Sequence, residues 1–141
     1  MSGFFTRTGA RLGVWLYRRT NGRAMNGGGP PRVLLLTTPG RRSGEPRPTC
    51  VASLRDGDAF VVWGTGAGSP RDPDWFKNLR AAGETTVQAG DRAFRARVRE
   101  LTGPERDAQW ARIVDHVPGV QGYAVKSGRT IPVAVLTPLD V

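Results

Sequence analysis

The hydrophobic positions in the first part of the chain, Gly3 to Arg23, recur at helical spacing, with arginines on another face. The apolar positions are Phe5, Leu12, Trp15 and Leu16, and the basic ones are Arg7, Arg11 and Arg18. This pattern predicts a basic amphipathic helix, which can pack on the domain or lie on an anionic bilayer with its arginines against lipid phosphate. We favour packing on the domain. The Gly- and Pro-rich segment 26–31 predicts a linker, so residues 1–31 are expected to precede the main domain.

From residue 32 to residue 141 the pattern changes to short apolar runs separated by turn residues, which is typical of strands. Val33–Thr38 is an apolar run that stops at Pro39-Gly40, and the next run is its expected antiparallel partner. An Asp-Gly turn leads into a third run, and a later strand alternates apolar residues with arginines. The other predicted strands are Arg47–Leu54, Ala59–Trp63, Thr85–Ala89, a strand with Phe94, Ala96 and Val98 inward and Arg95, Arg97 and Arg99 outward, and Ile131–Leu136.

Two short helices are predicted between these strands. Asp72 can cap a helix whose first residue is Pro73. Thr102 and Glu105 fit a T-x-x-E capping box, which predicts a second helix that runs to about His116. The residues of this second helix expected to face the core are Trp110, Ile113 and Val117.

Six short, mostly hairpin-linked strands without alternating long helices favour a mainly β (α+β) fold over a Rossmann sheet. We therefore expect a small antiparallel barrel over residues 32–141 with short flanking helices. The stretch after Pro118-Gly119 has no clear period and is interpreted as irregular. The 141 residues suffice for one domain with one core, which excludes two independent catalytic domains.

Charge and composition narrow the function further. Lys and Arg number 21 against 12 Asp and Glu, and the formal net charge of +9 suits an anionic partner. Cys50 is the only cysteine and His116 the only histidine, which excludes an intrachain disulfide and a Cys/His zinc site, so no metal is expected. No apolar run reaches the roughly 18 residues of a membrane span. We expect a cytoplasmic protein whose first helix could make it peripheral at a membrane, and no nucleic-acid partner, because the usual signatures are absent.

Motifs for hydrolytic chemistry are absent: the chain has no G-x-S-x-G, no H-E-x-x-H and no Walker A sequence. Asp115 and His116 are adjacent on the predicted helix, so their side chains diverge and do not suit a triad. His116 is therefore interpreted as structural. Cys50 lies in an apolar strand, which predicts a buried, inert thiol.

The segment Gly40–Arg47 is the most informative part of the sequence, because its glycines and three arginines could clamp a phosphate or a carboxylate. The same composition also fits a solvated basic hairpin, and composition alone leaves both open. The glycine-rich loop Gly64–Gly68 could let a planar ligand approach the backbone. Aromatic residues flank this loop: Trp63, Trp75 and Phe76. Together these features fit an anionic isoalloxazine-like cofactor better than a surface that reads nucleic-acid bases.

Three segments, residues 35–47 (LLTTPGRRSGEPR), 72–79 (DPDWFKNL) and 129–133 (RTIPV), resemble the deazaflavin-dependent nitroreductase family. The match runs in order from Val33 to Thr137 and leaves out the first helix and the linker. It implies a split β-barrel that binds reduced coenzyme F420, a deazaflavin with a phospholactyl and oligoglutamate tail. The implied activity is hydride transfer from the reduced ring to an acceptor.

The resemblance also implies cofactor-binding residues by position. The anionic tail would be bound by Arg41, Arg42, Ser43, Gly44 and Arg47, and the ring system would lie along Pro48, Thr49, Cys50 and Val51. The same groove would be lined by Trp63, Gly64, Thr65 and Gly66. The short helix would close it with Asp74, Trp75 and Asn78. Gly66 replaces a lysine that is common in the family's glycine loop, which removes one contact to an anion.

The acceptor site departs from the family pattern. Family members that reduce nitroimidazoles carry several tyrosines in the substrate pocket, whereas the matching positions here are Ala52, Val117 and Val120, and only Tyr123 is kept. This more apolar pocket implies a small lipophilic acceptor, such as a quinone, a nitroaromatic or an activated double bond. Thr65 and Tyr123 are the candidate catalytic residues because they can hydrogen-bond the acceptor. Tyr123 could also donate a proton, as could water.

Two other functions remain open at this point. The chain could be a non-catalytic cofactor carrier or anion-binding module, or a split barrel that binds FMN, since a phosphate clamp alone does not choose between flavin and deazaflavin. The carboxylates of an oligoglutamate tail suit the +9 charge and favour F420. A homodimer would cover exposed strand edges, although the sequence identifies no interface.

Overall fold

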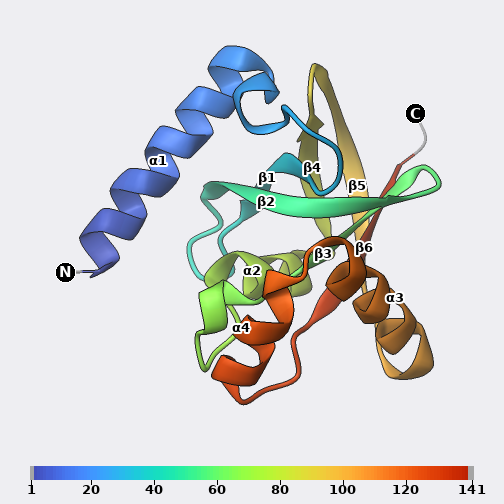
Figure 1. The fold of residues 1–141 in the computed structure, drawn as a ribbon. Helices are drawn as coiled ribbons and strands as arrows, with labels where there is room; N and C mark the ends of the chain where they lie inside the picture. Colours follow the sequence, from blue (N-terminus) through green and yellow to red (C-terminus); the bar gives the residue numbers. More distant parts are fainter. Residues whose placement is uncertain (1, 140–141) are drawn as a thin grey trace.

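The protein is a closed barrel of six antiparallel strands in the order β1-β2-β3-β6-β5-β4 (Figure 1). The computed structural model describes the backbone of residues 2–139 and the side chains of residues 11–139. The strands are β1 (Arg32–Pro39), β2 (Pro46–Asp56), β3 (Ala59–Trp63), β4 (Glu84–Ala89), β5 (Arg92–Glu100) and β6 (Val133–Pro138). The predicted mainly β barrel is confirmed, and each observed strand overlaps a predicted one.

The apolar runs divide between two cores. The barrel interior is filled by residues such as Leu34, Leu36, Val62, Val87 and Leu136. A second cluster lies outside the barrel, where helices α3 (Gly103–His116) and α4 (Gly119–Ser127) cover β3 and β6. Both faces of β3 and β6 are therefore buried, which explains why their sequences are continuously apolar instead of alternating. In β5 the predicted alternation is present, with its arginines outward.

The segment 119–127 is helix α4, so the prediction of an irregular stretch after Pro118-Gly119 is wrong. The inward residues Val120, Ala124 and Ser127 recur at helical spacing, but only one of them is a large hydrophobe. Because its core-facing stripe is so small and polar, the helix left little signal in the sequence.

Neither predicted capping hydrogen bond is present, although both helices begin close to the expected residues. Helix α2 (Asp74–Ala82) has Pro73 at its N-cap, and the Asp72 carboxylate instead contacts two arginines. Thr102 is the N-cap residue of α3, as predicted, but its side chain makes no capping hydrogen bond. Glu105 accepts two hydrogen bonds of 2.8 Å from Arg99. The two carboxylates thus bind guanidinium groups instead of helix amides. A guanidinium carries a full positive charge and can donate two parallel hydrogen bonds to one carboxylate, as Arg99 does to Glu105.

Helix α1 (Ser2–Thr20) packs on β2, but not through its predicted apolar face. Val14 and Tyr17 are the residues that contact Leu35 and Cys50, while the side chains of Leu12 and Trp15 are 62% and 58% exposed. Phe5, also predicted on the apolar face, lies outside the described side chains. A short turn of 3₁₀ helix (Arg23–Met25) and the linker then lead into β1.

Tyr17 determines which face of α1 turns inward. It is the largest fully buried side chain in the described part of the chain. Its hydroxyl lies 3.0 Å from the Val33 carbonyl oxygen and 2.9 Å from that of Gln88, and accepts a hydrogen bond from the Gly90 amide. One phenol therefore ties α1 to β1 and to the β4–β5 turn. Gly22 makes room for the ring, since a Cβ there would lie 2.7 Å from Cζ of Tyr17.

The substitution Tyr17→Phe is expected to lower the free energy of unfolding by about 1–3 kcal/mol, because partly buried backbone groups of Gln88 and Gly90 lose their contact with the hydroxyl. Urea unfolding monitored by circular dichroism measures this loss. The matched control is Tyr123→Phe, whose ring is 43% exposed, and which should change the free energy by about 0.5 kcal/mol or less. Equal effects of the two substitutions would contradict the role assigned to Tyr17.

The same residue makes stability depend on alkaline pH. Burial raises the pKa of Tyr17 above 10.0, against a smaller lowering by the Gly90 hydrogen bond. Its contribution is therefore complete below pH 10 and is lost as the pH rises through the higher folded-state pKa. The stability difference between the wild type and Tyr17→Phe should therefore stay constant up to about pH 10 and shrink above it. A constant difference would show that Tyr17 ionises equally in both states.

Candidate functional site

A groove of about 1040 Å³ runs along the outside of the barrel between α1, the β1–β2 connection and the start of α2. Figure 1 shows α1 on one side of this connection and α2 on the other. Nine of the residues predicted to bind the cofactor line it: Arg41, Arg42, Ser43, Arg47, Pro48, Thr49, Asp74, Trp75 and Asn78. The structure thus brings together residues that are up to 37 positions apart.

The connection between β1 and β2 is a tight turn closed by backbone hydrogen bonds. The Gly40 amide donates to the Glu45 carbonyl, and the Gly44 amide donates to the Gly40 carbonyl, both at 2.8 Å. Gly44 has a φ of +75°, which side chains rarely tolerate. Ser43 Oγ accepts hydrogen bonds from the Glu45 amide (3.1 Å) and the Arg47 guanidinium (3.3 Å). The turn therefore presents its basic side chains from a fixed backbone.

Arg41 ties this turn to α2. Its amide and its guanidinium both donate to Oδ1 of Asn78, at 3.1 and 2.9 Å, and the guanidinium also donates to Asp74 at 3.1 Å. Asn78 is buried, so this acceptor is fixed in place. Arg41 is thus largely committed to protein contacts. Arg42, which has no carboxylate partner among the described residues, and Arg47, whose contact with Glu45 is 3.7 Å long, remain able to bind an anion.

Helix α1 supplies groove residues that the sequence reasoning missed as cofactor contacts: Arg11, Val14, Trp15 and Arg18. Their spacing places them along one side of a helix, and this spacing is the feature of the sequence that could have identified them as a group. Which side faces the barrel depends on the burial of Tyr17, which periodicity did not show. Among residues 11–139, five arginines and one aspartate line the groove, so its lining is strongly basic.

Several predicted cofactor residues are outside the groove lining. Val51 points into the barrel core, and Cys50 lies half-buried against α1. Burial raises the pKa of the Cys50 thiol, as expected of an unreactive cysteine. Gly44 shapes the turn without lining the groove. Trp63, Gly64, Thr65 and Gly66 belong to the next connection, on β3 and in the loop before α2.

The loop at residues 64–69 is held by Arg129, a residue whose role the sequence reasoning did not identify. The Arg129 guanidinium donates to the carbonyl oxygens of Gly64, Thr65 and Ser69 at 3.0–3.1 Å and to Asp72 at 2.8 Å. Gly64 packs under α2, because a Cβ there would lie 3.1 Å from a ring carbon of Phe76. The loop geometry is therefore determined by an arginine 60 residues away in sequence.

Asp72 continues this contact into a network of four charged residues. Its second oxygen accepts a hydrogen bond of 3.0 Å from Arg80, and Arg80 also binds Glu100 of β5 at 2.6 and 3.0 Å. The hydrogen bond to Glu100 has the largest effect on the pKa of Arg80 and raises it. Partial burial lowers this pKa, and the hydrogen bond to Asp72 raises it further, so the pKa lies above its usual value. The network joins the glycine-rich loop, α2 and β5 into one unit.

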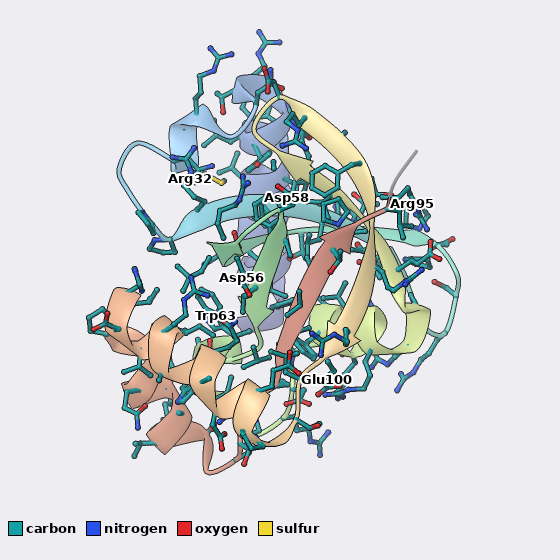
Figure 2. All side chains as sticks on the ribbon, turned by 90° about the vertical axis from the view of Figure 1, so that its right-hand side faces the viewer. Arg32, Asp56, Asp58, Trp63, Arg95 and Glu100 are labelled. Atoms are coloured by element: carbon teal, nitrogen blue, oxygen red, sulfur yellow. The ribbon has the colours of Figure 1, made fainter. Side chains whose placement is uncertain are left out.

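Three of the predicted substrate-pocket residues, Ala52, Val117 and Val120, lie in the second hydrophobic cluster together with Trp63. Figure 2 shows Trp63 at the end of β3, on the side of the barrel that α3 and α4 cover. Tyr123 is on α4 and 43% exposed. Helix α4 packs against the 3₁₀ turn at Gly66–Gly68, next to Thr65. His116 is exposed at the end of α3, where Nδ1 contacts the Arg112 carbonyl.

The described residues contain no group of three His, Cys, Asp or Glu side chains that could hold a metal ion. None of the described helices is both long enough and apolar enough to cross a membrane.

The closed antiparallel barrel and its flanking basic groove place the chain in the class of split-barrel proteins. A solved F420-H2 dependent reductase, FDR-A, superposes with a TM-score of 0.67 at 30% identity, over 74% of this chain and 92% of that one. A solved domain-swapped dimer has a TM-score of 0.70 at 25% identity, over 96% and 99% of the two chains.

The sequence profile of the F420H(2)-dependent quinone reductases matches residues 9–138, so the chain belongs to this family. An F420H(2)-dependent quinone reductase of Mycobacterium tuberculosis is 35% identical over 132 residues, which is 90% of this chain and 88% of the relative. The resemblance drawn from the three sequence segments is thus confirmed. The chain is an oxidoreductase, and its cofactor is reduced coenzyme F420.

Removing the Arg129 side chain, which holds the glycine-rich loop, should destabilise the protein. Arg129→Ala is expected to lower the free energy of unfolding by about 3 kcal/mol, because three carbonyl groups lose a partly buried cationic donor. Urea denaturation provides the measurement, with the exposed Arg97→Ala as a control of equal charge change and an expected loss near 0.5 kcal/mol or less. Similar losses for both variants would refute the anchoring role.

Proposed function

We propose that the chain holds reduced F420 in the groove between α1 and α2 and reduces a small lipophilic acceptor of the quinone class. The observation that carries this proposal is the groove lining, which combines five arginines with two tryptophans. Guanidinium groups bind phosphate and carboxylate oxygens through paired hydrogen bonds, and indole rings offer flat apolar surface. Such a lining suits a ligand that is both anionic and aromatic.

The residues divide the binding task. Arg42, Arg47 and Ser43 would bind the phosphate and nearby carboxylates. Arg41, held by Asn78 and Asp74, keeps the turn in position for them. Trp75, fixed by its edge-on contact with Phe76 at 5.5 Å between ring centroids, would offer an apolar surface to the ligand.

F420H2 supplies a hydride, that is, two electrons and one proton, when it is bound. A quinone that accepts this hydride needs one further proton to become a hydroquinone. Thr65 and Tyr123 are the residues we assign to the acceptor: each can hydrogen-bond a carbonyl oxygen, and Tyr123 can donate the proton. The apolar positions Ala52, Val117 and Val120 favour a lipophilic acceptor, with nitroaromatics and activated double bonds as further candidates.

Homodimer formation belongs to the same proposal. The solved domain-swapped dimer that matches 96% of this chain supports it. Sedimentation velocity distinguishes a 15.3 kDa monomer from a dimer of twice that mass, and a monomer at every concentration tested would rule it out.

The function is tested by a fluorescence titration of oxidised F420 beside FMN, followed by mixing the reduced F420 complex with menadione or a nitroimidazole. We expect binding of F420 over FMN and recovery of the oxidised chromophore with menadione. Arg42→Gln should weaken F420 binding about tenfold, which is the loss of about 1.4 kcal/mol of charge-assisted contact. Arg97→Gln, at an exposed position of β5 outside the groove, should leave F420 binding unchanged. Binding without turnover would identify a carrier, and FMN binding alone would reject the proposal.

Tyr123→Phe tests the proton donor. Removing only the hydroxyl should lower the rate of menadione reduction at least tenfold, since general acid catalysis is worth roughly 10²–10⁴ and water replaces part of it. The affinity for F420 should stay within twofold. Val125→Ala on the same helix, 75% exposed, controls for disturbance of α4. An unchanged rate in Tyr123→Phe would assign proton delivery to water.

A further inference from the structure

We propose that α1 forms the second wall of the cofactor site, where Arg11 and Arg18 bind carboxylates of the oligoglutamate tail. This inference rests on the proposed function and adds to it a contact from outside the barrel. The ligand class is a flexible chain that carries several carboxylates.

The first support is the shape of the groove. Arg11, Trp15 and Arg18 line it from α1, opposite the turn that bears Arg42 and Arg47. The two α1 arginines are two helical turns apart, about 10 Å along the axis. The β1–β2 turn alone is large enough to bind a single phosphate. Cationic groups spread over this length instead match a ligand whose charges are spread along a chain.

The second support is the fixed orientation of α1. Tyr17 is fully buried, and its hydroxyl contacts the backbone of Val33, Gln88 and Gly90. Val14 packs beside it on Leu35. Because these contacts define the rotation of the helix, the stripe with Arg11 and Arg18 is directed along the groove.

The third support is the balance of charge. Among the described side chains of the groove lining, Asp74 is the only carboxylate, and it is bound to Arg41. Arg11 and Arg18 have no carboxylate partner among residues 11–139. Arg18 also lies close enough to β2 for its charge to lower the pKa of Cys50, against the larger effect of burial. Positive charge is thus concentrated in a concave surface, where it attracts a polyanion most strongly.

A membrane surface is the competing partner for α1. Leu12 is 62% exposed and lies off the groove, so it could contact lipid. The arginines favour the tail, because Arg11 and Arg18 line a concave surface together with the turn, and a flat bilayer cannot enter such a groove. A vesicle-binding measurement therefore belongs in the test.

The test compares two forms of the cofactor by fluorescence titration: F420 with several glutamates and the phospholactyl deazaflavin without glutamate. In the double variant Arg11→Gln/Arg18→Gln, the dissociation constant of the long form should rise about tenfold or more. That of the short form should change less than twofold. The single variant Arg97→Gln removes a charge outside the groove and should leave both constants unchanged. Because both α1 arginines are exposed, circular dichroism should show an intact fold.

Four outcomes would overturn the inference. Unchanged affinity of the double variant for the long form would remove the tail contact while leaving the proposed function intact. Equal weakening of both forms would show a general loss of charge or of structure. Loss of binding to phosphatidylglycerol vesicles, with full affinity for the long form, would assign the arginines to a membrane. If the wild type bound neither form, the proposed function itself would fail, and this inference with it.

Discussion

The small size of the barrel is the constraint on which the rest of the structure depends. Six short strands enclose a space that their own side chains fill, including Leu36, Val62 and Leu136, so a ligand cannot enter the interior. Any binding site must be built on the outside, from the connections between strands and from added helices. The groove between α1, the β1–β2 turn and α2 is the candidate for such a site.

Arginine serves two purposes in this chain, and only the structure separates them. Arg41, Arg80 and Arg129 each bind carboxylates or carbonyl groups of other elements and so fix the turn, the helix α2 and the glycine-rich loop. Arg42 and Arg18 have no such carboxylate partners among the described residues and line the groove. A guanidinium that is already paired contributes little attraction to a ligand, whereas an unpaired one in a concave surface contributes more. The net charge alone therefore overstates the charge available for binding.

The sequence was sufficient where local pattern determines structure. The bounds of β3 were predicted correctly, and the basic turn and α2 were brought together through segment resemblance. The sequence was insufficient where a contact with a residue far away in the chain determines the orientation of a helix or the partner of a side chain. The phenol of Tyr17 turned α1 to an unexpected face, and Arg129 replaced an expected aspartate cap by an ion pair 57 residues apart. Helix α4 was missed because its inward stripe offers little hydrophobic contrast.

The separation of the groove from the apolar cluster under α4 has a consequence for the proposed reaction. Contacts to the anionic tail are made equally before and during hydride transfer, so they provide affinity without lowering the barrier. Under the proposed function, residues that contact the acceptor, such as Tyr123, would act on the rate instead. Val117, Val120 and Tyr123 lie at the end of α3 and on α4, whereas the groove is lined from α1, the β1–β2 turn, β2 and α2. Under the proposed function, substitutions at Val117 or Val120 would therefore change the acceptor while the residues of the groove stay the same. The separation of the groove from the residues near the acceptor would thus allow proteins with the same cofactor site to differ in the acceptor that they reduce.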